Sequence, residues 1–545
     1  TEEVKSETEK LLAMIDAAIK NGISAGTDVT DKYLVNADFE VKDKGWTVNK
    51  ASGGNVAYGG TSTNKCFEAW NNSNFDIYQE VSGAPVGVYE ISVQGFYRYG
   101  RGATAYDAYT NGTAPNDAVN IYVNNRNAHF KSVFDEPVTY GELYEDKGDN
   151  KPYVDPNEEY WYPNDMAAGS TAFANGMYKA TSFGVVANAG DVLRIGVKGN
   201  TSQLGDSWAI WDNFKMVFRG TDAEVVKPLL GDMIVDIQAA IDNLNADGKA
   251  VGKNAYDNAI AAIETGNTAY GGTDGKAMFE ALCAILAANE ALENSIATFA
   301  TLTAKVEELQ AAYFNSTASE AVKAEASALS NTINEGIANR TYNDEDVAGL
   351  IEQIDALIIK LAIPAEAENA SDNNPVSMTS LIKSASFDDG EGGNSIAGWN
   401  GTEGYNFGND ATQKGALALE FYNKKFDLNQ TIKGLPNGTY KITVTAFYRA
   451  GSTTDDYAEY SANGNANSNA FLYAVTNDTV KAPVTLLSSG ACEDMGVTGV
   501  TNIEDTELYV PNDMVSATAY FTDLEKYLNE IVVKVTDQIP TLGLK

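Results

Sequence analysis

Two stretches of the chain carry nearly the same sequence, GVYEISVQGFYRYG at positions 87–100 and GTYKITVTAFYRAG at positions 438–451. Seven of their first twelve aligned residues are identical, and both twelve-residue segments end in Phe-Tyr-Arg. In the first copy, one face of a period-two pattern carries Tyr89, Ile91, Val93 and Tyr97. This alternation is typical of a half-buried antiparallel strand. The sequence therefore predicts the same strand twice, 351 positions apart.

Other landmarks recur in the same order, at offsets of 348 to 353 positions. They are Phe39 with Phe387, Gly45-Trp46 with Gly398-Trp399, Glu68 with Glu420, and Pro-Asn-Asp-Met at 163 with the same four residues at 511. In each copy, short strand-like segments alternate with turns rich in Gly, Asn and Asp. This arrangement predicts a duplicated β-sandwich domain.

Between the copies the apolar period changes from two to 3.6, which predicts helices. The expected stripes are Leu230, Ile234, Ile237, Ile241 and Leu244, then Leu302, Val306, Leu309 and Tyr313, then Val347, Ile351, Ile354 and Ile358. Breaks near 248, 271, 316 and 341 fit six helices in two three-helix units. The fold class expected is multi-domain, with two β-sandwich domains separated by an all-α helical-bundle spacer.

Five parts are expected along the chain. Residues 1–32 would contain the last helix of a preceding helical unit, 33–220 the first sandwich, 221–298 and 299–379 two three-helix units, and 380–545 the second sandwich. IGVK at 195–198 aligns with LGLK at 542–545, and the SWAIWDNFKMVF that follows in the first copy has no counterpart. We therefore expect the second sandwich to lack its final strand, and the chain to be a fragment of a longer array.

Composition limits the partners. With 38 basic and 75 acidic residues the formal charge is −37, and such a surface repels nucleic-acid phosphates and anionic lipid headgroups. A neutral polysaccharide or a calcium ion is compatible with it. Three cysteines without a CxxC pair indicate neither a disulfide framework nor a zinc ribbon. No apolar run approaches the ~20 residues of a membrane-spanning helix. We expect an extracellular or cell-surface protein whose signal segment is absent from this sequence.

The repeated Phe-Tyr-Arg gives the first candidate site. Phe96 and Arg98, with Phe447 and Arg449 in the second copy, fall on the face opposite the core. An aromatic ring stacks on sugar C–H groups while a guanidinium binds hydroxyls. Trp70 points the same way as Glu68 on its own strand. Alternatively, helices or a long loop cover this face, and Arg98 pairs with an acid such as Glu68.

The second candidate is the aromatic loop EYWYPNDM, because loops held by a rigid sheet commonly carry binding residues. Its residues are Tyr160, Trp161, Asn164 and Asp165, with Asn512 and Asp513 as counterparts in the second copy. The alternative is a turn whose aromatic rings plug the end of the sandwich.

A family resemblance covers residues 33–219 and 380–545. The order NADFE, Gly45-Trp46, YEISV and WAIWDNFKMVF resembles the galactose-binding-like jelly-roll carbohydrate-binding modules. The GFYR, YVPNDM and WDNF segments are similar to those of Bacteroidetes surface and secreted proteins. The resemblance implies a jelly roll, a glycan ligand and a structural Ca²⁺ held by Glu40 and Asp212. Ordinary turn acids are the alternative for the two carboxylates.

Enzymatic interpretations have less support. His129 is the only histidine and has no counterpart in the second copy, and no GxSxG, P-loop or dinucleotide fingerprint is present. A glycosidase-type pair such as Glu68 with Asp165 stays open, because sequence does not give their separation. We therefore expect a non-catalytic glycan-binding protein with duplicated modules. The alternatives are a structural surface scaffold or adhesin with protein partners, and an accessory part of a glycoside hydrolase.

Overall fold

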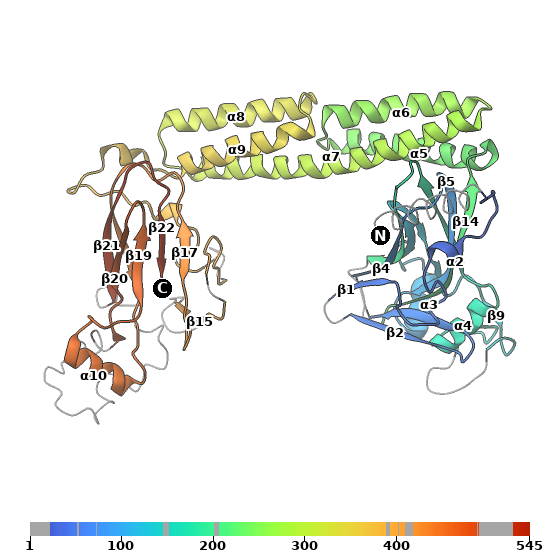
Figure 1. Cartoon of the computed structure of the whole chain (residues 1–545), viewed down its shortest axis with the longest axis horizontal. Helices are drawn as coiled ribbons and strands as arrows, with labels where there is room; N and C mark the ends of the chain where they lie inside the picture. Colours follow the sequence, from blue (N-terminus) through green and yellow to red (C-terminus); the bar gives the residue numbers. More distant parts are fainter. Residues whose placement is uncertain are drawn as a thin grey trace, which may run out of the picture. The chain divides into compact units, whose positions relative to one another are not determined.

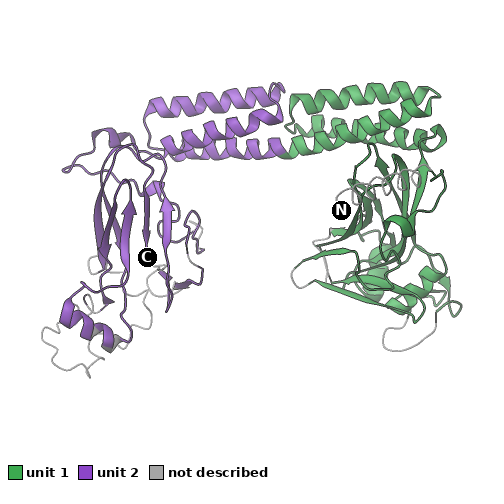
Figure 2. Ribbon diagram, viewed as in Figure 1, with its two compact units in different colours: residues 1–297 green, residues 298–545 purple. Residues whose placement is uncertain are grey.

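The computed structural model divides the chain into two compact units, residues 1–297 and 298–545 (Figure 2). It describes residues 22–51, 54–71, 74–144, 152–200, 206–388, 393–401, 403–408, 418–487, 489 and 527–545. The segment 1–21, on which the expected preceding helix falls, lies outside these residues, as do Asn512 and Asp513. Each unit combines a β domain with helices (Figure 1).

Two sheets build the first β domain, and all their pairings but one are antiparallel. One has the order β1 (Thr47–Lys50), β4 (Asn74–Val81), β13 (Leu193–Asn200), β6 (Val119–Val123) and β7 (Arg126–His129). The other has the order β12 (Lys179–Val186), β5 (Gly87–Arg98), β14 (Trp208–Gly220), β3 (Lys65–Trp70) and β2 (Asn55–Gly60), with the parallel β8 (Lys131–Ser132) on β5. A short helix, α2 (Thr30–Tyr33), precedes them.

The two sheets pack face to face through one apolar core. Tyr89, Ile91 and Val93 of β5 are at most 1% exposed within it, as their alternation predicts. Rings from both sheets meet there, for example Phe75 stacked on Trp211 with centroids 5.6 Å apart. The period-two pattern thus identifies the inner face of β5 correctly.

A separate layer lies on the outer face of the six-stranded sheet. It consists of α3 (Gly102–Thr110), α4 (Met166–Ala174) and a small sheet of β10 (Tyr153–Val154), β11 (Tyr160–Tyr162) and β9 (Val138–Thr139). Its side chains form a second apolar cluster with residues of the sheet. We call this layer, residues 99–117, 133–144 and 152–178, the cap.

Five helices follow in the described chain where six were expected. They are α5 (Ala223–Asp247), α6 (Lys253–Gly271), α7 (Gly275–Asn315), α8 (Glu320–Ala338) and α9 (Asp344–Leu361). The expected breaks at 248, 271, 316 and 341 are present, but the expected boundary at 298/299 falls inside α7. No Gly or Pro follows Gly275 within α7, so nothing in that segment favours a break.

The helices use most of the expected apolar positions. In α5 the stripe Leu230, Ile237, Ile241 and Leu244 is buried as predicted. In α9 the buried stripe is Val347, Leu350, Ile354, Leu357 and Leu361, so Ile351 and Ile358 lie at its flank instead of its centre. In the first unit, Val88 of β5 joins the core of α5, α6 and α7, which docks these helices on the β domain.

The second β domain contains fewer described strands. A four-stranded sheet has the order β17 (Leu428–Thr431), β22 (Thr541–Leu544), β19 (Phe471–Val475) and β20 (Thr479–Pro483). Two further pairs are β18 (Gly438–Thr445) with β21 (Leu528–Val535), and β15 (Asn406–Gly408) with β16 (Ala418–Glu420). The remaining elements are α10 (Thr453–Asn463) and two 3-10 turns, Ala365–Asn369 and Thr379–Leu381.

One hydrogen bond across an intervening strand recurs in both β domains. The Tyr122 hydroxyl of β6 donates to Asp76 Oδ1 of β4 at 2.5 Å, and Gly196 of β13 lies between them. A Cβ on Gly196 would lie 2.9 Å from the Tyr122 ring, so glycine is required there. The second domain repeats the bond at 2.5 Å with Tyr473, Asp427 and Gly543.

Candidate functional site

The outer face of the six-stranded sheet arranges the first candidate residues in two rows. The first row runs across four strands as Arg98, Trp208, Trp70 and Asn55. The second row runs as Phe96, Ile210, Glu68 and Ala57. Trp70, Phe96 and Arg98 therefore share one face, as their positions in the sequence predict.

The cap seals the second row. Phe96 is fully buried, with ring centroids 4.8 Å from Tyr178 and 5.1 Å from Trp208. α4 approaches the sheet closely, since a Cβ on Gly169 would lie 2.8 Å from Ile210 Cδ1. The expectation that Phe96 lies on an open face is wrong, because cap residues such as Phe173 and Tyr178 pack over its ring. The alternative of a covered face is correct here.

Arg98 is also buried, with 6% of its surface exposed. Its Nη1 donates to Asn164 Oδ1 at 2.6 Å and its Nε donates to Gly100 O at 2.9 Å. The guanidinium carbon lies 4.9 Å from the Trp208 ring centroid, within cation–π range. Burial, and then the neighbouring Arg101, lower the pKa of Arg98 to about 10. Its acceptors are thus a side-chain amide and a backbone carbonyl, and not the acid of the alternative interpretation.

This contact joins two of the separate motifs in the first β domain. The Arg of Phe-Tyr-Arg and the Asn of Pro-Asn-Asp-Met are hydrogen-bonded partners that tie the cap to β5. Asp165 Oδ1 then accepts the Ala168 N–H as the N-cap of α4. Both candidate motifs therefore serve the attachment of the cap in the first β domain.

Trp70 and Asn55 are the accessible members of the first row, and Trp70 has 39% of its surface exposed at the end of β3. Beside it, Trp208 is buried and its Nε1 donates to Glu68 Oε2 at 2.7 Å. Burial raises the pKa of Glu68, while the Trp208 hydrogen bond and Arg98 act in the opposite direction. An exposed indole thus adjoins a half-buried carboxylate whose position is fixed.

The aromatic loop is divided between surface and interior. Tyr160 is 40% exposed on β11, and Tyr140 beside the same small sheet is 49% exposed. Trp161 is only 6% exposed and packs edge-on against Tyr140 with centroids 4.9 Å apart. Trp161 Nε1 is buried, and it has no hydrogen-bond partner among the residues that the structure describes. The loop offers tyrosine rings to solvent, whereas Trp161 belongs to the cap interior.

In the second β domain the corresponding residues are less enclosed. Phe447 is half-buried against Tyr527, with centroids 5.4 Å apart, and Arg449 is exposed. Tyr422, which stands where Trp70 stands in the first copy, is 63% exposed. The counterparts Asn512 and Asp513 lie outside the described residues.

The two expected calcium ligands lie near each other, and each already accepts hydrogen bonds from the chain. Glu40 is exposed and its Oε1 accepts the Lys65 N–H at 2.6 Å. Asp212 is fully buried, with its two oxygens accepting from Asn213 N at 2.7 Å and Asn64 Nδ2 at 2.9 Å. In the described part of the chain, no three His, Cys, Asp or Glu side chains gather in a way that could hold a metal ion. Burial, and then the nearby Asp38 and Glu40, raise the pKa of Asp212 to about 8.

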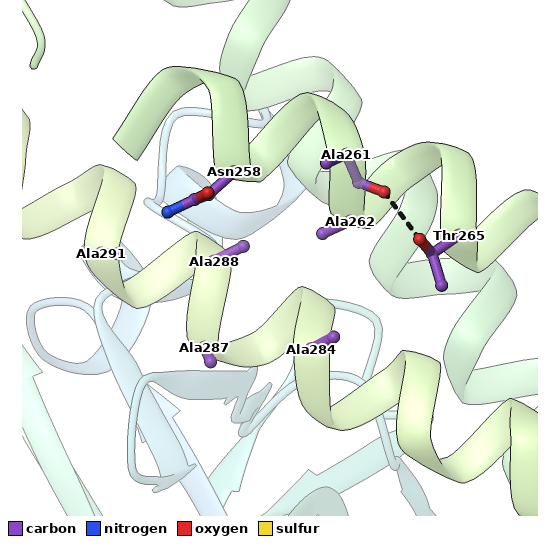
Figure 3. Close-up of a pocket in the computed structure, with 8 residues that line it drawn as sticks. All are labelled: Asn258, Ala261, Ala262, Thr265, Ala284, Ala287, Ala288 and Ala291. Carbon is purple, nitrogen blue, oxygen red and sulfur yellow. Dashed lines mark hydrogen bonds between the residues drawn. The ribbon is translucent and has the colours of Figure 1, made fainter. Parts of the chain in front are cut away.

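A hollow of about 370 Å³ lies between α6 and α7. Alanines from both helices line it together with Asn258 and Thr265 (Figure 3). The Thr265 hydroxyl is already bonded to Ala261 O at 2.9 Å. A surface with so few free polar groups does not orient a ligand.

Sequence reasoning missed Trp208 and Tyr140. Trp208 lies in the segment SWAIWDNFKMVF, whose tryptophans alternate toward the two faces of a strand, so its outward position could have been found. Tyr140 lies directly after β9, in the long connection to β10, where no periodic pattern in the sequence indicates which rings are exposed.

No family model and no curated protein matches the chain. Among solved structures, the carbohydrate-binding module TmCBM61 with β-1,4-galactotriose matches at 16% identity and TM-score 0.18, over 34% of this chain and 97% of that one. A Bacteroides thetaiotaomicron protein described as a candidate sugar-binding protein matches at 11% and 0.16, over 34% and 92%. CBM51-2 with the INT domains of Clostridium perfringens ZmpB matches at 14% and 0.13, over 45% and 44%. Likenesses this weak carry no argument about this chain.

In the described part of the chain, no helix is long and apolar enough to cross a membrane.

Proposed function

We propose that the chain is a non-catalytic glycan-binding protein, and that Trp70 and Tyr422 are the aromatic contacts of its two β domains. The observation that carries the proposal is the exposed ring at this matched position, 39% in the first copy and 63% in the second. A large exposed ring gains free energy when a sugar covers it, since the apolar C–H face of a pyranose leaves water. A ring kept exposed in both copies is not explained by packing.

Polar groups beside Trp70 support a neutral ligand. Glu68 offers carboxylate oxygens as acceptors. Arg101 and Asp206 lie close enough to Arg98 to shift its pKa. The residues around Trp70 thus carry two positive charges, on Arg98 and Arg101, and two negative charges, on Glu68 and Asp206. The site therefore has no strong preference for an anion. Sugar hydroxyls both donate and accept, which suits such a mixture.

The proposal that the site is non-catalytic rests on the two carboxylates that a glycosidase would use. Glu68 accepts from the Trp208 indole, and Asp165 caps α4. Each carboxylate already has a structural partner, which supports binding over hydrolysis. An extracellular or cell-surface location agrees with a polysaccharide partner and remains part of the proposal.

A structural scaffold or adhesin is the second candidate. The burial of Phe96, Arg98 and Trp161 favours it, because three residues first assigned to a sugar site serve the interior instead. In that case the exposed rings would contact no glycan, and the β domains would act as spacers or bind protein.

The test is binding of the full chain to neutral polysaccharides, first on a glycan array and then by titration calorimetry. Trp70→Ala and Tyr422→Ala should each weaken binding, and the double variant should lose more than either, because two linked sites raise the effective concentration of the second contact. Tyr160→Ala is the matched control, as it removes a ring of similar exposure on the cap. If only Tyr160→Ala loses binding, the site lies on the cap instead. If no glycan on the array binds the chain, the scaffold function is favoured.

Calcium at Glu40 and Asp212 is also kept as a proposal for the first β domain, since carboxylate oxygens are suitable ligands for this ion. Added calcium would raise the midpoint of thermal unfolding of the unaltered chain but not of Glu40→Gln. An unchanged midpoint in both chains would remove calcium from the proposal.

A further inference from the structure

The two exposed rings differ in the residue that lies beside them. In the first copy, Asn55 of β2 is directly opposite Trp70 of β3, and both side chains are exposed. Side chains of a directly opposed pair lie on the same face of a sheet, so the Asn55 amide adjoins the indole. β2 borders β3 on the edge away from β14, so this neighbour does not depend on β14. The ring of the first copy thus has an uncharged polar neighbour.

The second copy has a glycine at the position of that asparagine. β15 and β16 pair through Asn406 and Glu420. Gly404 lies two residues before Asn406, and Tyr422 lies two residues after Glu420. The two segments stay side by side beyond the pair, since the rings of the two intervening residues have centroids 6.3 Å apart. Gly404 is therefore opposite Tyr422, as the asparagine is opposite the tryptophan in the first copy.

Lys424 occupies the space beside this glycine. A Cβ on Gly404 would lie 3.2 Å from Lys424 Nζ and 3.4 Å from Lys424 Cε. Opposed residues have Cβ atoms about 4.5–5.5 Å apart, so the ammonium group adjoins Tyr422, whose ring is 63% exposed. Where the first site has an amide, the second has a positive charge.

The turn after each ring carries this difference. Asn71 and Asn423 follow the two rings with the same left-handed backbone, at φ 48° and 50°. The sequence continues as Asn-Ser-Asn-Phe in the first copy and as Lys-Lys-Phe in the second. Lys424-Lys425 is the only place in the 545 residues where two basic residues are adjacent. In a chain with 75 acidic and 38 basic residues, this pair is a local exception to the overall charge.

Both lysines are available to a ligand. They are exposed, and neither has an acidic partner in the part of the chain that the structure describes. Two exposed acids, Glu403 and Glu420, lie on the same segments, so the surface is mixed. The many other carboxylates act weakly here, because exposed charges are screened beyond about 8 Å at physiological ionic strength. An anion at the Tyr422 ring therefore responds chiefly to the lysine beside it.

We propose that the Tyr422 site selects an anionic sugar, one that carries a carboxylate or a sulfate group, while the Trp70 site takes neutral sugars. This inference rests on the proposed glycan-binding function, because it assigns a substrate class to one of its two sites. The tyrosine ring covers the apolar face of the sugar, and Lys424 Nζ donates to the anionic oxygens. A neutral sugar still contacts the ring but lacks that bond. The two domains then share a fold and differ in specificity.

The experiment uses the full chain with Trp70→Ala, which silences the first site, and follows binding by titration calorimetry. One pair of probes is an oligogalacturonate and its methyl ester, which differ in the charge of the carboxyl groups. The second pair is a galactan oligosaccharide with and without sulfate. The anionic member of at least one pair should bind about threefold to tenfold more tightly than the neutral member, as expected for one or two exposed ion pairs. Added salt should reduce this preference.

Variants in the same background test the lysine itself. Lys424→Ala should remove most of the preference for the anionic probe and leave binding of the neutral probe unchanged. Lys424→Arg, which keeps the charge, should retain the preference. The reciprocal change, Asn55→Lys in a chain with Tyr422→Ala, should give the first site a preference for the anionic probe. These positions are exposed, so each chain should fold, and circular dichroism checks this.

Two results would overturn the proposal and leave glycan binding intact. They are equal binding of the anionic and neutral members of both pairs, and an unchanged preference in the Lys424→Ala chain. Failure of all four probes to bind, in a chain whose unaltered form binds a neutral glycan, would overturn it as well. If the unaltered chain binds no glycan of either class, the proposed function itself fails, and the inference fails with it.

Discussion

Replacing Asn164 by alanine should destabilise the first β domain by about 2–3 kcal/mol, because it leaves a buried positive charge without its acceptor. Asn164 Oδ1 accepts from Arg98 Nη1 at 2.6 Å, and Arg98 is 6% exposed. A hydrogen bond to a charged group contributes about 1.5–3 kcal/mol, and leaving a buried charge unpaired costs more than the bond alone. At roughly 2–4 °C per kcal/mol for a domain of this size, the midpoint of thermal unfolding should fall by about 4–12 °C.

A double-mutant cycle separates this mechanism from a general packing defect. Arg98→Met removes the charge and keeps an apolar side chain of similar length, so Asn164 no longer has a cation to accept from. The double variant should be more stable than the sum of the two single effects predicts, by about 1–2 kcal/mol. Tryptophan fluorescence follows the first β domain in the full chain, because five of the six tryptophans, at 46, 70, 161, 208 and 211, lie there.

Additive effects of the two substitutions would refute the reasoning. So would a loss below about 0.5 kcal/mol for Asn164→Ala, which is the range of ordinary surface substitutions. Either result would mean that Arg98 and Asn164 do not depend on each other, and that this contact does not attach the cap to β5.

Two further predictions concern stability. Burial and two neighbouring carboxylates raise the pKa of Asp212 from 3.8 to about 8, so between these values the folded chain holds a proton that the unfolded chain has lost. The free energy of unfolding should therefore fall as pH rises from about 4 to about 8, and Asp212 should contribute at most about 1.4 kcal/mol per pH unit to this fall. In Asp212→Asn, the midpoint of urea unfolding should change less steeply with pH. The same slope in both chains would contradict this. In α9, Gly349→Ala should raise the midpoint of helix unfolding, since a Cβ there meets nothing within 4 Å and alanine favours a helix by about 1 kcal/mol. The matched Gly336→Ala in α8 should lower the midpoint, because its Cβ would lie 2.0 Å from Tyr342 Cε2. Equal effects of the two substitutions would show that the steric clash with Tyr342 does not determine the change in stability.

Local periodicity was enough to predict part of this fold. The inner face of β5 and the stripe of α5 follow directly from apolar residues at intervals of two and 3.6. In α9 the same method chose Ile351 and Ile358 where Leu350 and Leu357 are buried. Both sets repeat at helical spacing, so only the direction of the neighbouring helices decides between them.

The candidate site was harder to predict, because burial of an outer face depends on residues far away in the sequence. Phe96 lies on the predicted side of β5, yet the cap that covers it begins at residue 99 and ends near 178. Nothing in the alternation of β5 shows whether a later segment returns over that face. Trp70 stays accessible at the end of β3, and this too follows from where the cap stops and not from its own strand.

The bond from Tyr122 to Asp76 across Gly196 also limits how the first β domain assembles. A slip of one residue in β6 would turn Tyr122 toward the interior and break its bond to Asp76, and the same slip in β13 would place Ile195 or Val197 under the tyrosine ring. Because β4, β6 and β13 are far apart in sequence, the bond checks three distant segments at once. The second β domain holds Tyr473, Asp427 and Gly543 in the same arrangement, so the same check on strand alignment applies there.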